Sequence, residues 1–135
     1  MSSIIISTNK SELLPKEAVE LWVSLGWGKR DDYNENNVIE AIKNTSFLVF
    51  ARNSQGQLVG LVRVLSDEVI YTAIADFAIR SDYRDQEVGA KLMEEVKNKY
   101  KGTGIFIDEF KNNEEFFIKC GYVKRDNMIV LAKRF

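Results

Sequence analysis

The segment YRDQEVGAKLM, residues 83–93, contains the residue types of a turn that could hold a phosphate group. It follows an apolar run and enters a helical pattern, and the N–H groups at the start of a helix attract anions. Gly89 keeps one position where the backbone can approach a ligand or adopt a positive φ. The acidic Asp85 and Glu87 would each repel a phosphate by about 1 kcal/mol at roughly 4 Å in water. The residues alone leave two alternatives open, a phosphate-binding turn and a helix start stabilised by acidic side chains.

Asp76 is a second candidate for chemistry, because it interrupts the apolar, strand-like run TAIADFAI. Alternation predicts that Asp76 shares one strand face with Ile74 and Ala78. A carboxylate at such a position is costly if it is buried without a partner, so we expect it to face a cleft or an ion pair. Two roles therefore stay open: Asp76 orients or deprotonates a substrate, or it forms a salt bridge with a residue such as Arg63.

The composition excludes several classes of function. The chain has 135 residues with 19 basic and 20 acidic side chains, so no basic face for nucleic acid is indicated. The absence of histidine excludes Ser-His and Cys-His nucleophile pairs and His-based zinc sites, and we expect no metal. The single cysteine, Cys120, is typical of a reducing cytoplasm. No apolar stretch reaches transmembrane length, and we expect a cytoplasmic protein without a membrane partner.

Apolar periodicity predicts a single domain, residues 1–135, with a mixed α/β sheet. Short β-branched or apolar runs predict strands over 2–7, 47–51, 58–65, 69–79 and 104–108. Helical spacing predicts helices over 15–27, 34–44, 87–100 and 112–121. Residues 122–135 are predicted to form a closing hairpin, which makes the element order β-αα-βββ-α-β-α-ββ. We expect a mostly antiparallel sheet flanked by helices.

This order resembles the GNAT superfamily of N-acetyltransferases over nearly the whole chain. The strongest local match is DFAIRSDYRDQEVGAKLM, residues 76–93, which resembles the family's strand-turn-helix with its turn Arg-Gly-x-Gly-Ile-Gly-x-x-Leu. Arg84 takes the Arg position and Gly89 that of the last glycine, while Asp85 and Glu87 stand where glycines are usual. A second segment, EEFFIKCGY, is similar to the family's Phe-Tyr-x-x-x-Gly-Phe.

The resemblance implies transfer of an acetyl group from acetyl-coenzyme A to the amine of a small molecule. In this family the pyrophosphate of coenzyme A lies on backbone N–H groups of the turn, and the acetyl-pantetheine arm lies in a gap where the preceding strand splays from its neighbour. The cofactor-binding residues implied in this way are Phe77, Ala78, Ile79, Arg84, Asp85, Gln86, Glu87, Val88, Gly89, Ala90, Asn113 and Phe117.

The resemblance also implies catalytic roles. Asp76 could accept the proton of the attacking amine, directly or through water. The family's Tyr, which protonates the departing thiolate, is replaced by Phe117, so Tyr122 is the candidate substitute, with Cys120 and water as alternatives. An aromatic residue at the start of a half-buried strand is also a usual core residue, and both roles stay open for Tyr122.

The acceptor is expected to meet GWGKRDDYNE, residues 26–35, where Trp27 and Tyr33 could offer an aromatic face to a cationic amine. A solvated loop with Trp27 packed on the core is the alternative for this segment. Two other functions stay open. The lost glycines and Tyr are also compatible with a degenerate domain that binds coenzyme A as a sensor or acts as an interaction module. Acetylation of protein or peptide N-termini is the other alternative, and a homodimer is compatible with the resemblance.

Overall fold

The computed structural model describes residues 3–84 and 87–133, and its strands form one mixed sheet in the order β1-β2-β3-β4-β5. Strands β1 to β4 pair antiparallel, and β5 lies parallel to β4. The strands are β1 (Ile5–Ser7), β2 (Phe47–Arg52), β3 (Leu58–Ser66), β4 (Tyr71–Ile79) and β5 (Gly104–Ile107). The helices are α1 (Pro15–Ser24), α2 (Glu35–Asn44), α3 (Val88–Lys99) and α4 (Glu114–Lys119). The predicted mixed, mostly antiparallel sheet is confirmed.

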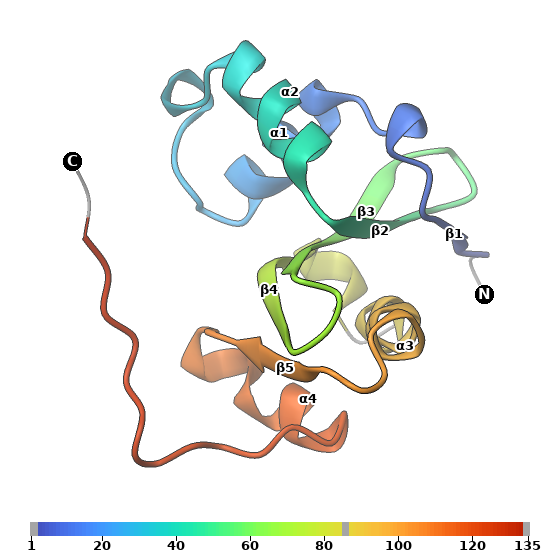
Figure 1. The fold of residues 1–135 in the computed structure, drawn as a ribbon. Coiled ribbons are helices and arrows are strands. Elements are labelled where there is room, and N and C mark those ends of the chain that lie inside the picture. The colour runs from blue at the N-terminus through green and yellow to red at the C-terminus, as the bar shows by residue number, and fades with distance from the viewer. Residues whose placement is uncertain (1–2, 85–86, 134–135) are drawn as a thin grey trace.

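Helices cover the two faces of the sheet as separate layers, with α1 and α2 on one face and α3 and α4 on the other (Figure 1). The helical spacing of apolar residues causes this arrangement, because each helix buries a single stripe against the sheet. No helix among the described residues is long and apolar enough to cross a membrane.

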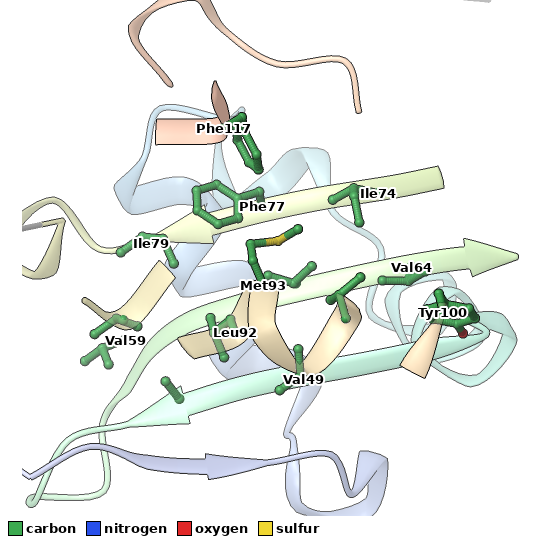
Figure 2. Packing of buried hydrophobic residues seen from close by; sticks show 14 residues of the cluster. Val49, Val59, Val64, Ile74, Phe77, Ile79, Leu92, Met93, Tyr100 and Phe117 are labelled. Atoms are coloured by element: carbon green, nitrogen blue, oxygen red, sulfur yellow. The ribbon is translucent and has the colours of Figure 1, made fainter. Parts of the chain in front are cut away.

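Close packing of α3 on the sheet depends on a glycine in β3. A Cβ at Gly60 would lie 2.9 Å from side-chain atoms of both Leu92 and Val88, so only glycine lets the helix approach this closely. Figure 2 shows the resulting core, in which Leu92 and Met93 of α3 lie against valines of β2 and β3. The start of α3 is thereby held next to the end of β4.

A β-bulge and an early end of pairing shape β4. Arg63 of β3 pairs with Asp76, but the next residue of β3 pairs with Ile74, so Ala75 is the extra residue of a bulge. The bulge reverses the alternation: Ile74 joins the core on the α3 face, whereas Asp76 lies opposite Arg63 on the α1 face. The predicted common face of Asp76 and Ile74 is therefore wrong. Pairing with β5 also stops at Ile74, so residues 75–79 diverge from β5 as the resemblance implied.

The predicted closing hairpin is wrong for the residues that the structure describes. Residues 122–133 contain no strand, although a turn forms where the N–H of Met128 donates to the carbonyl of Arg125 at 3.2 Å. The chain on both sides of this turn runs along the outside of the molecule (Figure 1). A two-stranded hairpin needs a further strand or helix on which to bury its apolar side chains, and none covers this one. The predicted order therefore holds from β1 through α4, and residues 134–135 lie outside the described residues.

Candidate functional site

A cavity of about 700 Å³ lies where β4 diverges from β5. Its walls come from the segment after α1, the end of β4, the start of α3, and α4 with the segment that precedes it. Six of the residues predicted as site residues line it together: Trp27, Phe77, Ile79, Arg84, Gly89 and Asn113. The divergence of two neighbouring strands thus creates a ligand-sized space at the place that the resemblance implied.

The main chain of β4 directs polar groups into this gap. The N–H of Arg80 donates to the carbonyl of Val59 at 2.9 Å, which makes these two residues a hydrogen-bonded pair of the antiparallel ladder. Because such pairs alternate, the next one joins Ala78 to Leu61. The N–H and C=O groups of Phe77 and Ile79 consequently point away from β3, toward the diverging side.

The start of α3 supplies further donors. The first intrahelical bond runs from the N–H of Lys91 to the carbonyl of Glu87 at 3.1 Å, so the N–H groups of Val88, Gly89 and Ala90 lack intrahelical acceptors. These groups and the positive end of the helix dipole favour an anion. Asp85 and Gln86, also predicted to bind the cofactor, lie outside the described residues.

Glu87 caps this helix in a left-handed conformation, with φ 62° and ψ 8°. The family's usual glycine takes such a backbone without cost, whereas a glutamate is strained by roughly 1–3 kcal/mol. Glu87 is also exposed, so its carboxylate lies in water near the donors of α3. Glu87 therefore adopts a strained conformation at a position where the family usually has a glycine.

Gly89 is needed for space and not for a positive φ, contrary to the second part of our expectation. Gly89 lies inside α3, and its φ is not positive, unlike that of five other described glycines. A Cβ at Gly89 would meet Cζ of Phe77 at 2.9 Å and Cζ of Phe116 at 3.1 Å. The missing side chain therefore lets two aromatic rings and the helix start meet at the cavity wall.

Arg84 is positioned at the cavity by the segment that leads into α4. Its guanidinium donates to Oδ1 of Asn113, which is buried and lines the same cavity. The nearby Glu109 is half-buried: desolvation raises its pKa, while hydrogen bonds from the Phe110 N–H and the Asn113 side chain and the charge of Arg84 act in the opposite direction. Lys119 adds a second cation and Glu115 an anion to the cavity lining.

Four aromatic rings form a cluster beside the cavity, and two of them, Phe77 and Phe116, line it. Phe77 contacts Phe116 and Phe117 at centroid distances of 5.1 and 4.8 Å, and Phe117 contacts Tyr122 at 5.5 Å. Figure 2 shows Phe117 lying against Phe77 above the sheet. Phe117 is buried, and Tyr122 packs behind it and is not among the residues that line the cavity. Both residues pack in this cluster, and the predicted cofactor contact of Phe117 and catalytic role of Tyr122 stay predictions.

Burial further favours the protonated form of the two candidate proton donors. It raises the pKa of Tyr122 to about 12, so the phenol keeps its proton at neutral pH. Burial, and secondarily the charge of Glu94, raises the pKa of the Cys120 thiol. Neither group is an activated nucleophile.

Asp76 forms the ion pair that the sequence left open. Both oxygens of its carboxylate accept from the Arg63 guanidinium, with Nη2 to Oδ1 at 3.3 Å. Arg63 also donates to Thr45 Oγ1 at 3.2 Å and lies over the ring of Trp22. Asp76 is not among the cavity-lining residues, yet its charge contributes, after burial, to raising the pKa of Tyr33. It therefore lies on the α1 side of the sheet, near the predicted acceptor residues.

Of the two predicted acceptor residues, Trp27 lines the cavity, and Tyr33 packs beside it without lining the cavity. The Tyr33 hydroxyl donates to the carbonyl of Trp27, and the Tyr33 ring stacks on Trp22 at 5.5 Å. Across the mouth, Phe110 faces Trp27 at a centroid distance of 6.4 Å while remaining 62% exposed. Phe110 was not among the predicted site residues, although an aromatic residue two positions after a predicted strand was an available signal.

Comparison with protein families identifies the class of protein. The sequence matches the model described as Acetyltransferase (GNAT) domain over residues 16–131. Because this match covers most of the chain, the protein belongs to the GNAT acetyltransferase family and is an acyltransferase. No curated protein sequence matches the chain.

Solved structures with the same fold support this assignment. A probable acetyltransferase of unknown function from meticillin-resistant Staphylococcus aureus has a TM-score of 0.84 at 14% identity, over 98% of this chain and 100% of that one. A GNAT family acetyltransferase from Streptococcus pneumoniae has a TM-score of 0.75 at 18% identity, with 98% and 100% covered. Glucosamine-6-phosphate N-acetyltransferase from Arabidopsis thaliana has a TM-score of 0.75 at 18% identity, with 98% and 99% covered. At these identities the likeness shows the fold.

Proposed function

We propose that this acetyltransferase moves the acetyl group of acetyl-coenzyme A to the amine of a small molecule. The observation that carries the proposal is the cavity at the diverging ends of β4 and β5, which has helix-start donors on one side and an aromatic mouth on the other. One neighbour of the same fold is named for acetylation of glucosamine-6-phosphate, a small molecule with an amine.

The residues present fit the cofactor. The N–H groups of residues 88–90 and the Arg84 guanidinium would hold its pyrophosphate. The outward-facing main-chain groups of Phe77 and Ile79 would bind the pantetheine amides, as an added strand would. Gly89 lets the rings of Phe77 and Phe116 lie at the cavity wall, because a Cβ there would meet them at 2.9 and 3.1 Å. The positive charges of Arg84 and Lys119 oppose the negative charge that Glu87 adds.

On the acceptor side, Trp27 and Phe110 would hold an amine between two rings, where cation–π attraction favours a positive group. The amine must lose a proton before it attacks, and Asp76 is the proposed acceptor of that proton, through water or the neighbouring Tyr33. Arg63 donates hydrogen bonds to both oxygens of Asp76. Asp76 must therefore release one of these bonds before that oxygen can accept the proton. Glu109, a half-buried carboxyl beside the cavity residues Phe110 and Asn113, is the alternative acceptor.

When bound, acetyl-coenzyme A supplies an activated thioester. A main-chain N–H of β4 that faces the gap can stabilise the charge that develops on the thioester oxygen. Tyr122 keeps its proton at neutral pH and is the proposed donor to the departing thiol, with water as the competing donor because the cavity lining does not include Tyr122. Positioning of the two reactants supplies much of the rate in either case.

The test is a calorimetric titration with acetyl-coenzyme A, followed by measurement of thiol release with a panel of small amines. We expect binding and amine-dependent thiol release. Absence of binding would contradict the proposal, binding without thiol release would favour a sensor, and release only with a peptide amine would favour a peptide acetyltransferase.

A matched pair of variants tests the pyrophosphate site. Arg84→Ala is expected to weaken binding about tenfold, because a charge-assisted hydrogen bond contributes roughly 1.5–3 kcal/mol. Arg30→Ala removes an exposed arginine that pairs with Glu20 at 3.7 Å on α1, and is expected to leave the dissociation constant unchanged. Equal affinities of the two variants would place the pyrophosphate elsewhere.

A further inference from the structure

The ion pair between Arg63 and Asp76 leaves part of the guanidinium unused. Nε and Nη2 donate to the Asp76 carboxylate, and Nη1 donates to Thr45 Oγ1 at 3.2 Å. Nη1 and Nη2 are NH₂ groups, and each makes a single hydrogen bond to the described residues, so each keeps an N–H donor without an acceptor there. The donors of a guanidinium match the two oxygens of a carboxylate. Arg63 therefore retains donors for a further carboxylate.

The indole of Trp22 is a second donor of this kind. Its Nε1 has no hydrogen-bond partner among the described residues, although the side chain is only 6% exposed. The Trp22 ring contacts the Arg63 guanidinium at 5.8 Å and the Tyr33 ring at 5.5 Å. Buried polar groups in native proteins are rarely left unpaired. Unused donors on two neighbouring side chains indicate a site for a group that accepts hydrogen bonds.

The ion pair is open to solvent on the acceptor side of the cavity. The side chains of Arg63 and Asp76 remain 18% and 16% exposed, and the bulge residue Ala75 next to Asp76 is exposed. Bulges are frequent beside active sites, where they redirect a side chain. Tyr33 connects the pair to the cavity, because its hydroxyl donates to the carbonyl of the lining residue Trp27, while the charge of Asp76 acts on the same phenol.

The other charges at this place nearly cancel. Lys10 Nζ donates to the carbonyl of Thr45, the residue whose hydroxyl accepts from Arg63. Asp32, the other carboxylate that acts on Tyr33, accepts from the N–H of Lys29 at 2.8 Å. An incoming carboxylate is therefore attracted mainly by the Arg63 guanidinium at short range, where it competes with Asp76.

We propose that the acceptor is an amino acid whose carboxylate binds Arg63 and thereby frees Asp76, an inference that rests on the proposed acetyl transfer to a small amine. Because Arg63 and Asp76 are in direct contact, the carboxylate and the amine of the acceptor must be close together, as in an α-amino acid. A carboxylate that shares its guanidinium with a second anion binds a proton more readily. Asp76 then takes the proton that the ammonium group loses and passes it to solvent.

Thiol release from acetyl-coenzyme A with α-amino acids and the matching α-amino acid amides tests the acceptor class. The amide keeps the amine and the side chain but carries no negative charge. We expect at least one amino acid to react with a kcat/KM about tenfold or more above that of its amide, because the amide loses the charge-assisted hydrogen bond to Arg63. The amide has the less basic amine, which favours its reaction at neutral pH, so this preference does not come from basicity.

Arg63→Gln tests the residue, because glutamine keeps a hydrogen-bond donor and removes the charge. The preference for the acid over its amide is expected to disappear, mainly through a higher KM for the acid. A loss of folded protein lowers both rates equally, so a merely structural Arg63 would leave the ratio unchanged. The matched control, Arg52→Gln, removes an arginine of β2 that is 21% exposed and pairs with Glu17, and is expected to keep the preference.

Calorimetry separates this inference from the proposed function. The preferred amino acid is titrated into protein saturated with coenzyme A, which has no acetyl group, so no turnover is needed. Wild type and Arg52→Gln are expected to bind it with equal affinity, and Arg63→Gln at least tenfold more weakly.

Several outcomes overturn the inference while leaving acetyl transfer intact: equal use of acids and amides, an unchanged affinity or preference in Arg63→Gln, or a preference for glucosamine-6-phosphate over every amino acid. Absence of thiol release with any amine contradicts the proposed function, and the inference with it.

Discussion

Replacing Glu87 by glycine changes both the strain and the charge at the proposed pyrophosphate site. Glu87 is one of two described non-glycine residues with a positive φ, and it caps the helix whose N–H groups would hold the cofactor. Glycine adopts this conformation without a steric penalty, and it removes a carboxylate from the neighbourhood of a bound anion.

The expected gain in stability follows from the backbone. A non-glycine residue in the left-handed region destabilises the folded chain by about 1–2 kcal/mol, and Glu87→Gly removes this strain. Part of the gain is lost because glycine has greater conformational freedom in the unfolded chain. A net gain on the order of 1 kcal/mol remains. For a chain of 135 residues this corresponds to a rise in the melting temperature of roughly 3–5 °C.

The expected gain in affinity follows from the charge. Two like charges about 4 Å apart in water repel by roughly 1 kcal/mol, and removal of that repulsion changes a dissociation constant about fivefold. The exposed position of Glu87 justifies the value for water, because no burial strengthens the repulsion. Salt should reduce the difference, since screening weakens interactions between exposed charges.

Two companion variants separate the effects. Glu87→Gln keeps the strained backbone and removes the charge, so it should tighten binding without raising the melting temperature. Glu68→Gly relieves the second positive φ, 70°, which lies in the loop between β3 and β4. Glu68 lies near Tyr100, at the C-terminal end of α3, whereas Glu87 lies at the N-terminal end. Glu68→Gly should leave the affinity for acetyl-coenzyme A unchanged. Calorimetry and thermal denaturation on the same preparations measure both quantities.

The reasoning is refuted if neither Glu87→Gly nor Glu87→Gln tightens binding. The carboxylate would then point away from the anion, or the anion would bind elsewhere; the Arg84→Ala titration distinguishes these two explanations.

Three further variants test other parts of the site. Asp76→Asn should lower turnover about 10²-fold or more if the carboxylate accepts the proton, and normal turnover by the folded variant would direct attention to Glu109. Gly89→Ala should weaken cofactor binding and cost about 1–3 kcal/mol of stability, because its Cβ would meet Phe77 Cζ at 2.9 Å; an unchanged dissociation constant would argue against cofactor at this wall. Tyr122→Phe should make the free energy of unfolding fall less steeply as the pH rises above about 10. Burial raises the pKa of Tyr122 to about 12 from 10.0, so its contribution is present below pH 10 and is lost between about pH 10 and 12. Identical melting curves of wild type and variant across that range would contradict this.

Local patterns of the sequence predicted much of the fold. Helical spacing located α1 to α4, and β-branched runs located the five strands, because each of these elements is stabilised by one continuous apolar face. The strand-turn-helix motif likewise predicted the cavity residues Arg84 and Gly89, since the motif is a contiguous piece of chain. Secondary structure and contiguous motifs depend on neighbours in sequence, which a sequence displays directly.

Features that depend on contacts between distant residues were decided by the tertiary structure. The bulge at Ala75 arises from the register between β3 and β4, and it moved Ile74 to the face opposite Asp76. Phe110 entered the cavity mouth because the chain after β5 faces the segment after α1. Residues 123–133 have the composition of a strand, but a strand forms only where another strand offers hydrogen bonds and an apolar surface. A sequence states which residues prefer to be strand; the availability of a partner edge is a property of the folded molecule.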